Sequence, residues 1–394
     1  MKRVWRWIAV LGLVIVLLLV IGGVLFLRAA TPPAPSAFYT PPAPLPPGVP
    51  GTIIRSEPIT TNLPEGAVAW RILYLSTGLQ GEPIAVSGIV IAPEGESAAP
   101  RPVIAWAFGT LGVVPECGTS HRNDPFALIS ALDVMVREGF IVAATDYPGR
   151  GTPGIHPYLV GPVEAHAILD AVRAAQRLDA AVGDRFALWG ASQGGHAVLW
   201  AAHRAPEYAP ELVLVGAATQ AAAIDLPGLF EATLDRPIGG LLMSQALYAW
   251  GHTYPDADLD TIIAPERRAQ FENLARTCLT NPLAFVRMRE IPPLSAFLRA
   301  DPLALEPWRT IVHANVPHGA IVVPLLITHG TDDPLIPLEG SVAEAARRCT
   351  QGEDVTLMRF PGVGHPGSDD TGASTIGWIQ DRFAGRSTGP TCGR

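Results

Sequence analysis

Six short apolar segments alternate with helical sequence along most of the chain, and turn residues bound each of them. The segments are rich in Val, Ile, Leu and Ala and lack polar alternation, which is typical of parallel strands buried on both faces of a sheet. The predicted strands are Pro102–Phe108, Phe140–Thr145, Phe186–Trp189, Leu212–Ala218, Pro324–Thr328 and Val355–Phe360. Strands that alternate with helices predict an α/β fold, with a mostly parallel sheet flanked by helices.

Two regions depart from this alternation. Val68–Tyr74 and Ile84–Ile91 alternate apolar and polar residues and lie close together, which predicts an antiparallel hairpin at the edge of the sheet. From about Asp225 to Val316 helical patterns continue without a convincing strand. About 90 residues are too many for a simple loop. We therefore expect a helical cap at about 225–316, over the strand ends where open α/β sheets bind ligands; a helical domain unrelated to the site is the alternative.

The N-terminus predicts export. Trp7–Leu27 is an apolar run of 21 residues, long enough to cross a hydrocarbon layer of roughly 30 Å. Three positive charges precede it, which places the N-terminus in the cytoplasm and the rest of the chain outside. Residues 1–30 are thus predicted to be a transmembrane anchor. A cleaved signal peptide is the alternative, although the run is long and lacks a good small-x-small site; both interpretations export the body.

The next segment, 31–50, has nine prolines in twenty residues. Such a segment is extended and semi-rigid, so it predicts a stalk that holds the body off the membrane. The remaining 51–394 is predicted to be a single catalytic domain that includes the cap.

Charge and cysteine content exclude several classes of protein. Residues 1–50 carry four basic and no acidic residues, so the rest carries 24 basic and 36 acidic residues, a poor match for a phosphate backbone. Nucleic acid is therefore excluded as a partner. The four cysteines contain no CxxC pair, which argues against a zinc knuckle or a redox motif, and their spacing leaves three disulfide pairings open.

The candidate nucleophile lies in Gly190–Gly194, which reads G-x-S-x-G. A predicted strand runs directly into this motif, and Gly195–Arg204 after it has a helical pattern. A tight strand-to-helix turn of this kind projects the hydroxyl of Ser192 above the sheet, and the N–H of Gln193 faces the same space. A simple Gly–Ser loop is the alternative.

A serine hydroxyl is a weak nucleophile and needs a base and an acid that orients the base. In this architecture both follow the nucleophile along the chain, the acid first. Two aspartates, Asp332 and Asp333, follow the strand 324–328, and the residues alone do not choose between them. His365 lies on a glycine-rich loop after the strand 355–360 and is the predicted general base.

The tetrahedral intermediate needs two donors for its oxyanion. The N–H of Gln193 is the first candidate. The second is the loop after the strand 102–108, at Gly109 and Thr110; a tight turn without a catalytic role is the alternative for these residues.

Several longer motifs are similar to those of the secretory lipase family of fungi and actinobacteria. They are Trp106–Gly112, Thr145–Gly154, His156–Gly161, Leu169–Ala175 and Ser192–Gly195. The similarity extends from about Pro50 to Cys392. It implies an α/β-hydrolase fold with a helical cap, and hydrolysis of lipids and other carboxylic esters by a Ser–Asp–His triad without a metal or a cofactor.

The resemblance also indicates which of the two aspartates is the acid of the triad. The family motif G-x-x-D-x-x-[VI]-P aligns with Gly330, Asp333, Ile336 and Pro337. This alignment assigns the acid to Asp333 and leaves Asp332 as a residue that caps a turn.

The resemblance further implies two disulfides, Cys117–Cys278 and Cys349–Cys392. Two features depart from the family. Many bacterial members read HGT where this chain has Phe108-Gly109-Thr110, so the oxyanion loop is expected to differ in shape. A membrane anchor is also not general to this family.

The sequence therefore predicts a monomeric serine esterase or lipase that acts outside the cytoplasm. Its expected partners are a small-molecule ester or lipid substrate and, through the anchor, its own membrane. Two alternatives remain: a peptidase or amidase of the same fold, and a catalytically silent surface protein. A clear acid that could hold the amine of a peptide substrate is not evident, and the intact Ser192, Asp333 and His365 argue against the silent protein.

Overall fold

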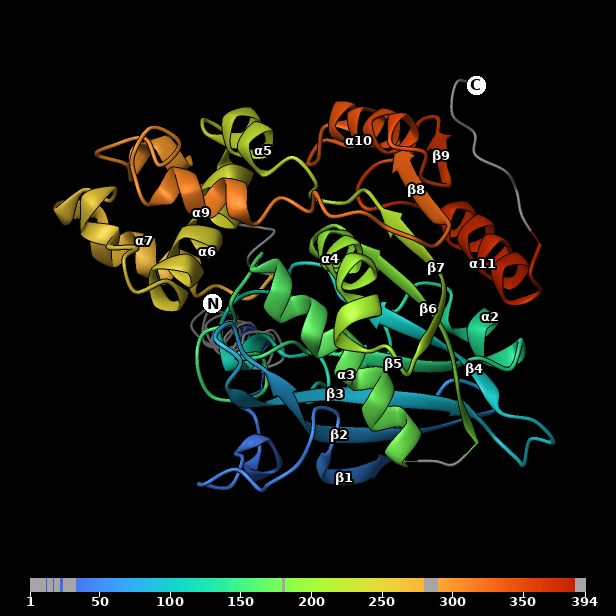
Figure 1. Ribbon diagram of the computed structural model, residues 1–394. Helices are drawn as coiled ribbons and strands as arrows, with labels where there is room; N and C mark the ends of the chain where they lie inside the picture. Colours follow the sequence, from blue (N-terminus) through green and yellow to red (C-terminus); the bar gives the residue numbers. More distant parts are fainter. Residues whose placement is uncertain are drawn as a thin grey trace, which may run out of the picture.

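The computed structural model describes residues 33–178, 181–279 and 290–386, together with Gly12, Leu17, Gly22 and Gly23. This part of the chain contains a nine-stranded sheet in the order β1-β2-β3-β5-β4-β6-β7-β8-β9 (Figure 1). The strands are β1 (Ile53–Ile59), β2 (Ala67–Thr77), β3 (Pro83–Pro93), β4 (Arg101–Ala107), β5 (Ile141–Thr145), β6 (Val182–Ala191), β7 (Val213–Gln220), β8 (Leu325–Gly330) and β9 (Val355–Phe360). From β5 to β9 all neighbours are parallel, which confirms the six predicted strands.

The predicted hairpin exists as β2 and β3, but it does not form the edge of the sheet. The strand β1 pairs antiparallel with β2 on its outer side. The run Arg55–Pro58 makes β1 too polar to resemble the buried strands. Proline is also tolerated in an edge strand, where one row of N–H groups needs no partner.

Helices connect the strands and flank the sheet. They are α2 (Leu132–Arg137), α3 (Gly161–Leu178), α4 (Gln193–Tyr208), α10 (Leu338–Thr350) and α11 (Asp369–Phe383). The helix α3 packs against α4 and the central strands. One face of α3 carries an apolar stripe that is completely buried or nearly so, formed by Ala165, Ile168, Leu169 and Val172.

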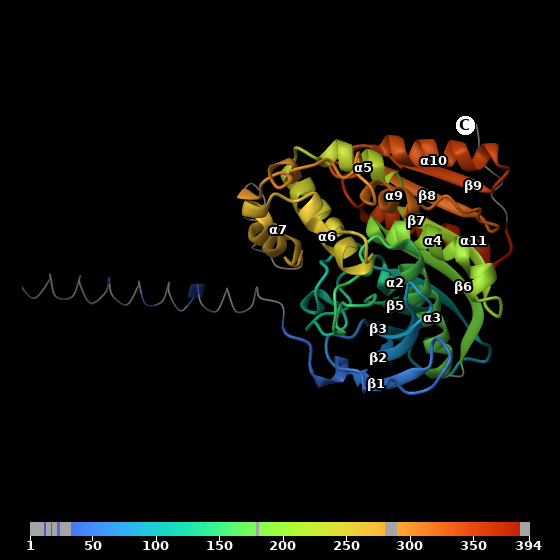
Figure 2. The ribbon, with the colours of Figure 1, turned by 60° about the vertical axis from the view of Figure 1, so that its left-hand side comes forward.

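The predicted cap is present between β7 and β8. Its longer helices are α5 (Leu226–Thr233), α6 (Pro237–Thr253), α7 (Arg268–Ala275) and α9 (Trp308–Ala314), which group together on one side of the molecule (Figure 2). The cap has an apolar core of its own, in which Trp250, Phe271 and Trp308 are fully buried. The predicted helical segment Leu283–Arg289 lies outside the described residues.

Within the predicted stalk, the residues around Tyr39 contact the body of the protein. Tyr39 is 2% exposed and accepts a hydrogen bond of 3.0 Å from Ser120 Oγ. Arg55 donates hydrogen bonds to the carbonyl oxygens of Phe38 and Thr40, at 2.9 and 2.6 Å. An aromatic side chain between the prolines thus gains enough burial to hold the segment in place, which proline content alone did not indicate.

The predicted anchor, Trp7–Leu27 within residues 1–30, lies outside the described residues apart from Gly12, Leu17, Gly22 and Gly23. Among the residues that are described, none of the helices has the length and hydropathy needed to cross a bilayer.

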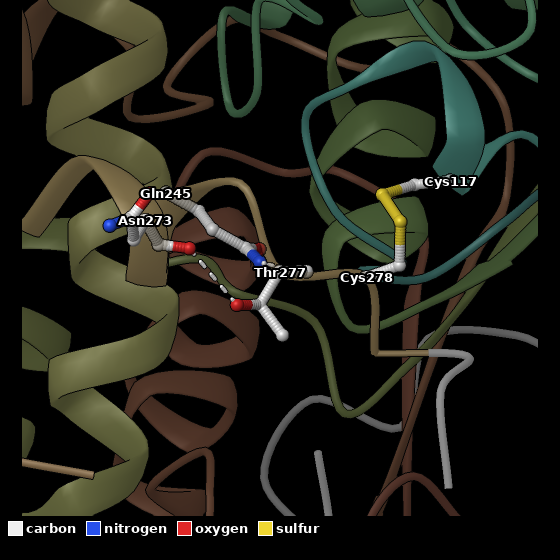
Figure 3. The surroundings of a disulfide bond; sticks show 5 residues. All are labelled: Cys117, Gln245, Asn273, Thr277 and Cys278. Atoms are coloured by element: carbon white, nitrogen blue, oxygen red, sulfur yellow. Dashed lines mark hydrogen bonds between the residues drawn. A yellow bond between two sulfur atoms is a disulfide. The ribbon is translucent and has the colours of Figure 1, made fainter. Parts of the chain in front are cut away.

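The disulfide Cys117–Cys278 joins the loop after β4 to the end of α7 in the cap (Figure 3). Both cysteines are buried, and next to the bridge Leu279 N donates to Leu111 O at 2.9 Å. This confirms the first predicted pairing. Cys349 is disulfide-bonded as well, and the partner expected for it, Cys392, lies outside the described residues.

Replacing Cys117 and Cys278 together by alanine is expected to lower the free energy of unfolding by about 4 kcal/mol. The two positions are 161 residues apart, and in the chain-entropy model a loop this long restricts the unfolded chain strongly. Urea unfolding of both proteins, without reductant, measures the difference. A double variant as stable as the wild type would show that the bridge does not limit the unfolded chain.

Candidate active site

Ser192 occupies the turn between a strand and a helix. The strand β6 ends at Ala191 and α4 begins at Gln193. Between them Ser192 has φ 57° and ψ −119°, a backbone conformation that residues other than glycine rarely adopt. The G-x-S-x-G motif therefore forms the strained strand-to-helix turn that the sequence predicts.

The glycines of the motif permit close contact between this turn and the neighbouring strand. A Cβ atom on Gly194 would lie 2.0 Å from the carbonyl oxygen of Ala107, at the end of β4. A Cβ atom on Gly190 would lie 2.5 Å from Gly194 O. Any larger residue at either position would push the turn away from β4 and from the loop that follows it.

Asp333 and His365 form a direct pair at the ends of two adjacent parallel strands. Asp333 follows β8, His365 follows β9, and His365 Nδ1 lies 2.8 Å from Asp333 Oδ2. The other carboxylate oxygen of Asp333 accepts hydrogen bonds from the N–H groups of Leu335 and Ile336, at 2.8 and 2.9 Å. The Nδ1 of His365 must donate to this carboxylate, which leaves Nε2 free to accept a proton.

The carboxylate of Asp333 is held in its charged form. Its side chain is 1% exposed. Burial raises its pKa, but hydrogen bonds with His329 and His365 outweigh burial and hold the pKa of Asp333 well below its usual range. The other candidate, Asp332, is exposed and accepts a hydrogen bond from Thr331 Oγ1 at 2.9 Å. The geometry therefore pairs His365 with Asp333.

His329 is a second partner of this carboxylate that the sequence did not suggest. Its Nε2 lies 3.4 Å from Asp333 Oδ2 and 3.1 Å from Ile336 O, and its ring is fully buried. Its Nδ1 lies 2.8 Å from Ser341 Oγ. His329 is only four residues before Asp333 in the chain, and the turn between them places its ring beside the carboxylate.

Gln220 connects the loop of His365 to the nucleophile turn. The N–H of Ser192 donates to the carbonyl of Gln220, the last residue of β7, at 2.8 Å. A Cβ atom on Gly367, two residues after His365, would lie 1.9 Å from Gln220 Nε2. Ser192 and the loop that carries His365 therefore both adjoin Gln220 at the carboxyl end of the sheet.

The predicted oxyanion loop also lies next to Ser192. A Cβ atom on Gly109 would be 3.8 Å from Ser192 Cβ. The hydroxyl of Thr110 is hydrogen-bonded to Tyr158 at 2.9 Å, and Tyr147 donates to the carbonyl of Phe108 at 3.2 Å. These contacts hold the loop beside the nucleophile turn.

A buried polar network, which the sequence did not reveal, lies behind Gln193. The side chain of Gln193 donates to Glu164 Oε1 at 2.6 Å and to His156 Nε2 at 2.7 Å. His196, one helical turn after Ser192, lies between two acceptors: Glu164 Oε2 at 3.2 Å and the carbonyl of Asn315 at 2.7 Å. Glu164 on α3 thus contacts two side chains of α4, Gln193 and His196, next to the nucleophile turn.

Acid is expected to destabilise the protein through Glu164. Burial raises the pKa of this carboxyl, but hydrogen bonds with His156 and His196 dominate and lower it to about 2, from an ordinary value of 4.5. The resulting stability is present above pH 4.5 and is lost as the pH falls from 4.5 toward 2. Urea unfolding should therefore show that the free energy of unfolding falls less between pH 6 and pH 3 for Glu164→Gln than for the wild type.

The exposed Glu266 provides the control, since Glu266→Gln should keep the pH dependence of the wild type. If the free energy of unfolding depended on pH equally in Glu164→Gln and Glu266→Gln, this would contradict the lowered pKa of Glu164.

A mostly apolar cavity of about 220 Å³ adjoins these groups. Its lining includes Ala222 and Ala223 after β7, Leu229 of α5, and Ile336 and Pro337 after the acid. The N–H of Ala223 donates to the carbonyl of the nucleophile at 3.3 Å. The cavity therefore lies between the segment after β7, the cap helix α5 and the loop after the acid; Ser192, Asp333 and His365 are not among its lining residues.

The arrangement places a serine in a strained strand-to-helix turn and an Asp–His pair at the same edge of the sheet. Within residues 33–178, 181–279 and 290–386 the structure contains no group of three or more His, Cys, Asp or Glu side chains placed to hold a metal ion. The chemistry that these side chains can perform by themselves is acyl transfer.

Known proteins are similar to this chain in sequence and in fold. A family model described as secretory lipase matches residues 126–390. Lipase 10 of Candida albicans is 27% identical over 92% of this chain and 84% of its own length. A probable inactive lipase of Mycobacterium tuberculosis is 29% identical, over 90% and 83%. The solved structure of Candida antarctica lipase A matches with a TM-score of 0.78 and 20% identity, over 92% of this chain and 89% of that one, which confirms the predicted α/β-hydrolase fold.

Proposed function

This chain belongs to the secretory lipase family and is a carboxylic ester hydrolase, and we propose that it is a serine-dependent one that works outside the cytoplasm through an acyl-enzyme. The observation that supports this most strongly is the Asp333–His365 pair, with 2.8 Å between the two side chains, at the same edge of the sheet as the strained turn of Ser192.

In the proposed mechanism Ser192 Oγ attacks the ester carbonyl while His365 Nε2 accepts its proton. Asp333 orients the imidazole and stabilises its charged form. The N–H of Gln193 and the Gly109–Thr110 loop donate to the oxyanion of the tetrahedral intermediate. His365 then returns the proton to the leaving alcohol, and water activated by the same histidine releases the acid.

The cavity lined by Ala223, Leu229 and Ile336 is proposed to hold the acyl chain. Its lining is mostly apolar, which suits a hydrocarbon chain. Its volume of about 220 Å³ is below the 300–1,000 Å³ that is typical of pockets for drug-sized ligands. We therefore expect esters with short acyl chains to be better substrates than esters of C16 acids.

The proposed location is the extracytoplasmic side of the membrane. The Cys117–Cys278 disulfide fits an oxidising compartment, and the family is described as secretory. Trp7–Leu27 is proposed to anchor the body to its own membrane, or to direct secretion if it is cleaved. We propose a monomer.

The alternative of a catalytically silent homologue is favoured by one observation, the similarity to a relative described as a probable inactive lipase. It is disfavoured by the Asp333–His365 pair, which is complete in this chain.

A series of p-nitrophenyl esters from C2 to C16 tests the proposed function. We expect hydrolysis with a maximum at short chains, and stoichiometric inactivation by diethyl p-nitrophenyl phosphate with the adduct mapped to Ser192. Absence of hydrolysis for every ester, together with no adduct, would favour the silent homologue. Faster cleavage of p-nitroanilides than of esters would favour the amidase.

A further inference from the structure

Arg150 is a fully buried cation immediately behind the proposed oxyanion site. It ends the turn Asp146–Arg150 after β5, and its relative exposure is 0%. Its Cζ lies 5.2 Å from the centre of the Tyr147 ring, which provides a favourable contact for a positive charge. Burial lowers the pKa of Arg150, but a guanidinium remains protonated at neutral pH.

The guanidinium contacts both segments that are proposed to bind the oxyanion. Its Nη1 lies 3.5 Å from the carbonyl oxygen of Gly109 and 3.5 Å from the side-chain oxygen of Gln193. These distances are at the outer limit of hydrogen bonding, so the interaction is mainly that of a charge with two dipoles. The Nε and Nη2 atoms have no hydrogen-bond partner among the residues that the structure describes, and the carboxylates of Asp146 and Glu164 act on the guanidinium through charge without a direct ion pair.

The contact with Gly109 acts on a specific peptide group. The carbonyl of Gly109 and the N–H of Thr110 belong to one peptide, so a cation at the oxygen polarises the N–H and makes it a stronger donor. The preceding peptide is polarised in a similar way. The hydroxyl of Tyr147 donates to the carbonyl of Phe108 at 3.2 Å, and the N–H of this peptide is that of Gly109. One turn after β5 thus supports both candidate amide donors of the loop.

We infer that Arg150 is a positioning residue for the oxyanion site: its buried charge strengthens the Gly109–Thr110 donors, fixes them relative to Gln193, and stabilises the negative charge that develops on the substrate oxygen. The inference rests on the proposed serine mechanism and deepens it. Since the charge develops only in the transition state, the effect belongs to kcat and not to substrate binding.

The test compares Arg150→Gln and Arg150→Lys with the wild type on p-nitrophenyl butyrate. Direct removal of an oxyanion donor costs about 100- to 1,000-fold in kcat, so the loss of a supporting charge in Arg150→Gln is expected to lower kcat about 10- to 100-fold with KM within about twofold. Arg150→Lys keeps the charge and should recover most of the loss.

The control variant is Arg382→Gln. Arg382 is also a buried arginine stacked on an aromatic ring, with its Cζ 4.7 Å from the centre of Trp378, but it lies on α11. It should change thermal stability without changing kcat by more than about twofold.

Inhibition by a trifluoromethyl ketone distinguishes support of the oxyanion from a purely structural role of Arg150, which would not change the inhibition constant. When Ser192 Oγ bonds to its carbonyl carbon, the hydroxyl proton passes to His365 and the carbonyl oxygen becomes a stable oxyanion. The inhibition constant should rise in Arg150→Gln by about the factor by which kcat falls, while that of the matching methyl ketone stays within about twofold.

A folded Arg150→Gln with the kcat of the wild type would overturn the inference, as would an Arg150→Lys that is no better than Arg150→Gln. If Arg150→Gln does not fold, Tyr147→Phe tests the same support by removing one hydroxyl, and an unchanged kcat there would also count against it. A wild type that hydrolyses no ester would instead refute the proposed function.

Discussion

Replacing Ser192 by alanine is expected to lower kcat for ester hydrolysis by a factor of about 10⁵ to 10⁶. The comparison is with serine hydrolases in which removal of the nucleophile costs about 2 × 10⁶. The residual rate reflects the amide donors of Gln193 and of the Gly109–Thr110 loop, which remain in place. The measurement is kcat on p-nitrophenyl butyrate together with covalent labelling by diethyl p-nitrophenyl phosphate, which should disappear.

The fold should tolerate this change. Alanine keeps the same backbone, and Ser192 N and O continue to bond to Gln220 O and His196 N, since both are main-chain contacts. The free energy of unfolding is therefore expected to change by less than about 1 kcal/mol. Ser374→Ala on α11 is the matched control and should leave activity unchanged. A Ser192→Ala variant with more than 1% of the wild-type rate would assign the nucleophile elsewhere.

Replacing Asp333 by asparagine is expected to lower kcat by about 10⁴. The main-chain N–H groups of Leu335 and Ile336 both donate to one oxygen of this side chain. They will therefore keep the amide oxygen of an asparagine and turn its NH₂ group toward His365. Nδ1 of His365 then becomes the acceptor, its proton moves to Nε2, and the nitrogen that should accept the proton of Ser192 is blocked.

Asp332→Asn is the matched control for this prediction, because Asp332 is the adjacent aspartate and is exposed. Its kcat should stay within about threefold of the wild type across pH 6 to 9. If Asp332→Asn lost more than 100-fold while Asp333→Asn kept a tenth of its activity, the acid would be Asp332 and the 2.8 Å pair with His365 would have no catalytic role.

The central sheet could be predicted because its strands are buried on both faces. The strand Ile141–Thr145, which lies within the predicted strand Phe140–Thr145, is an almost wholly apolar run that is buried along its whole length. The strand β1 could not be predicted, since Arg55–Pro58 has the composition of a loop and its place is fixed by pairing with β2. The packing of residues 33–50 depends on a pocket for Tyr39 that forms only in the folded body.

The candidate site divides in the same way. Ser192 and His365 have local signals, a G-x-S-x-G turn and a glycine-rich loop after a strand. Two adjacent aspartates after β8 give identical local signals; the family motif assigns the acid to Asp333, and the folded loop pairs that residue with His365. Glu164 is the clearest case of a hidden residue, because an isolated glutamate in a helix normally lies at the surface, and its partners Gln193 and His196 come from a different helix.

The Cys117–Cys278 bridge closes part of the chain into a covalent ring. The ring contains Ser192, while Asp333 and His365 lie on the tail beyond it. The main sheet contact between ring and tail is the pairing of β7 with β8. The strand β8 can separate from β7 without breaking a covalent bond, and the nucleophile turn then stays inside the ring. The proposed triad is thus assembled across a non-covalent boundary, and a local opening there would stop catalysis while most of the fold persists.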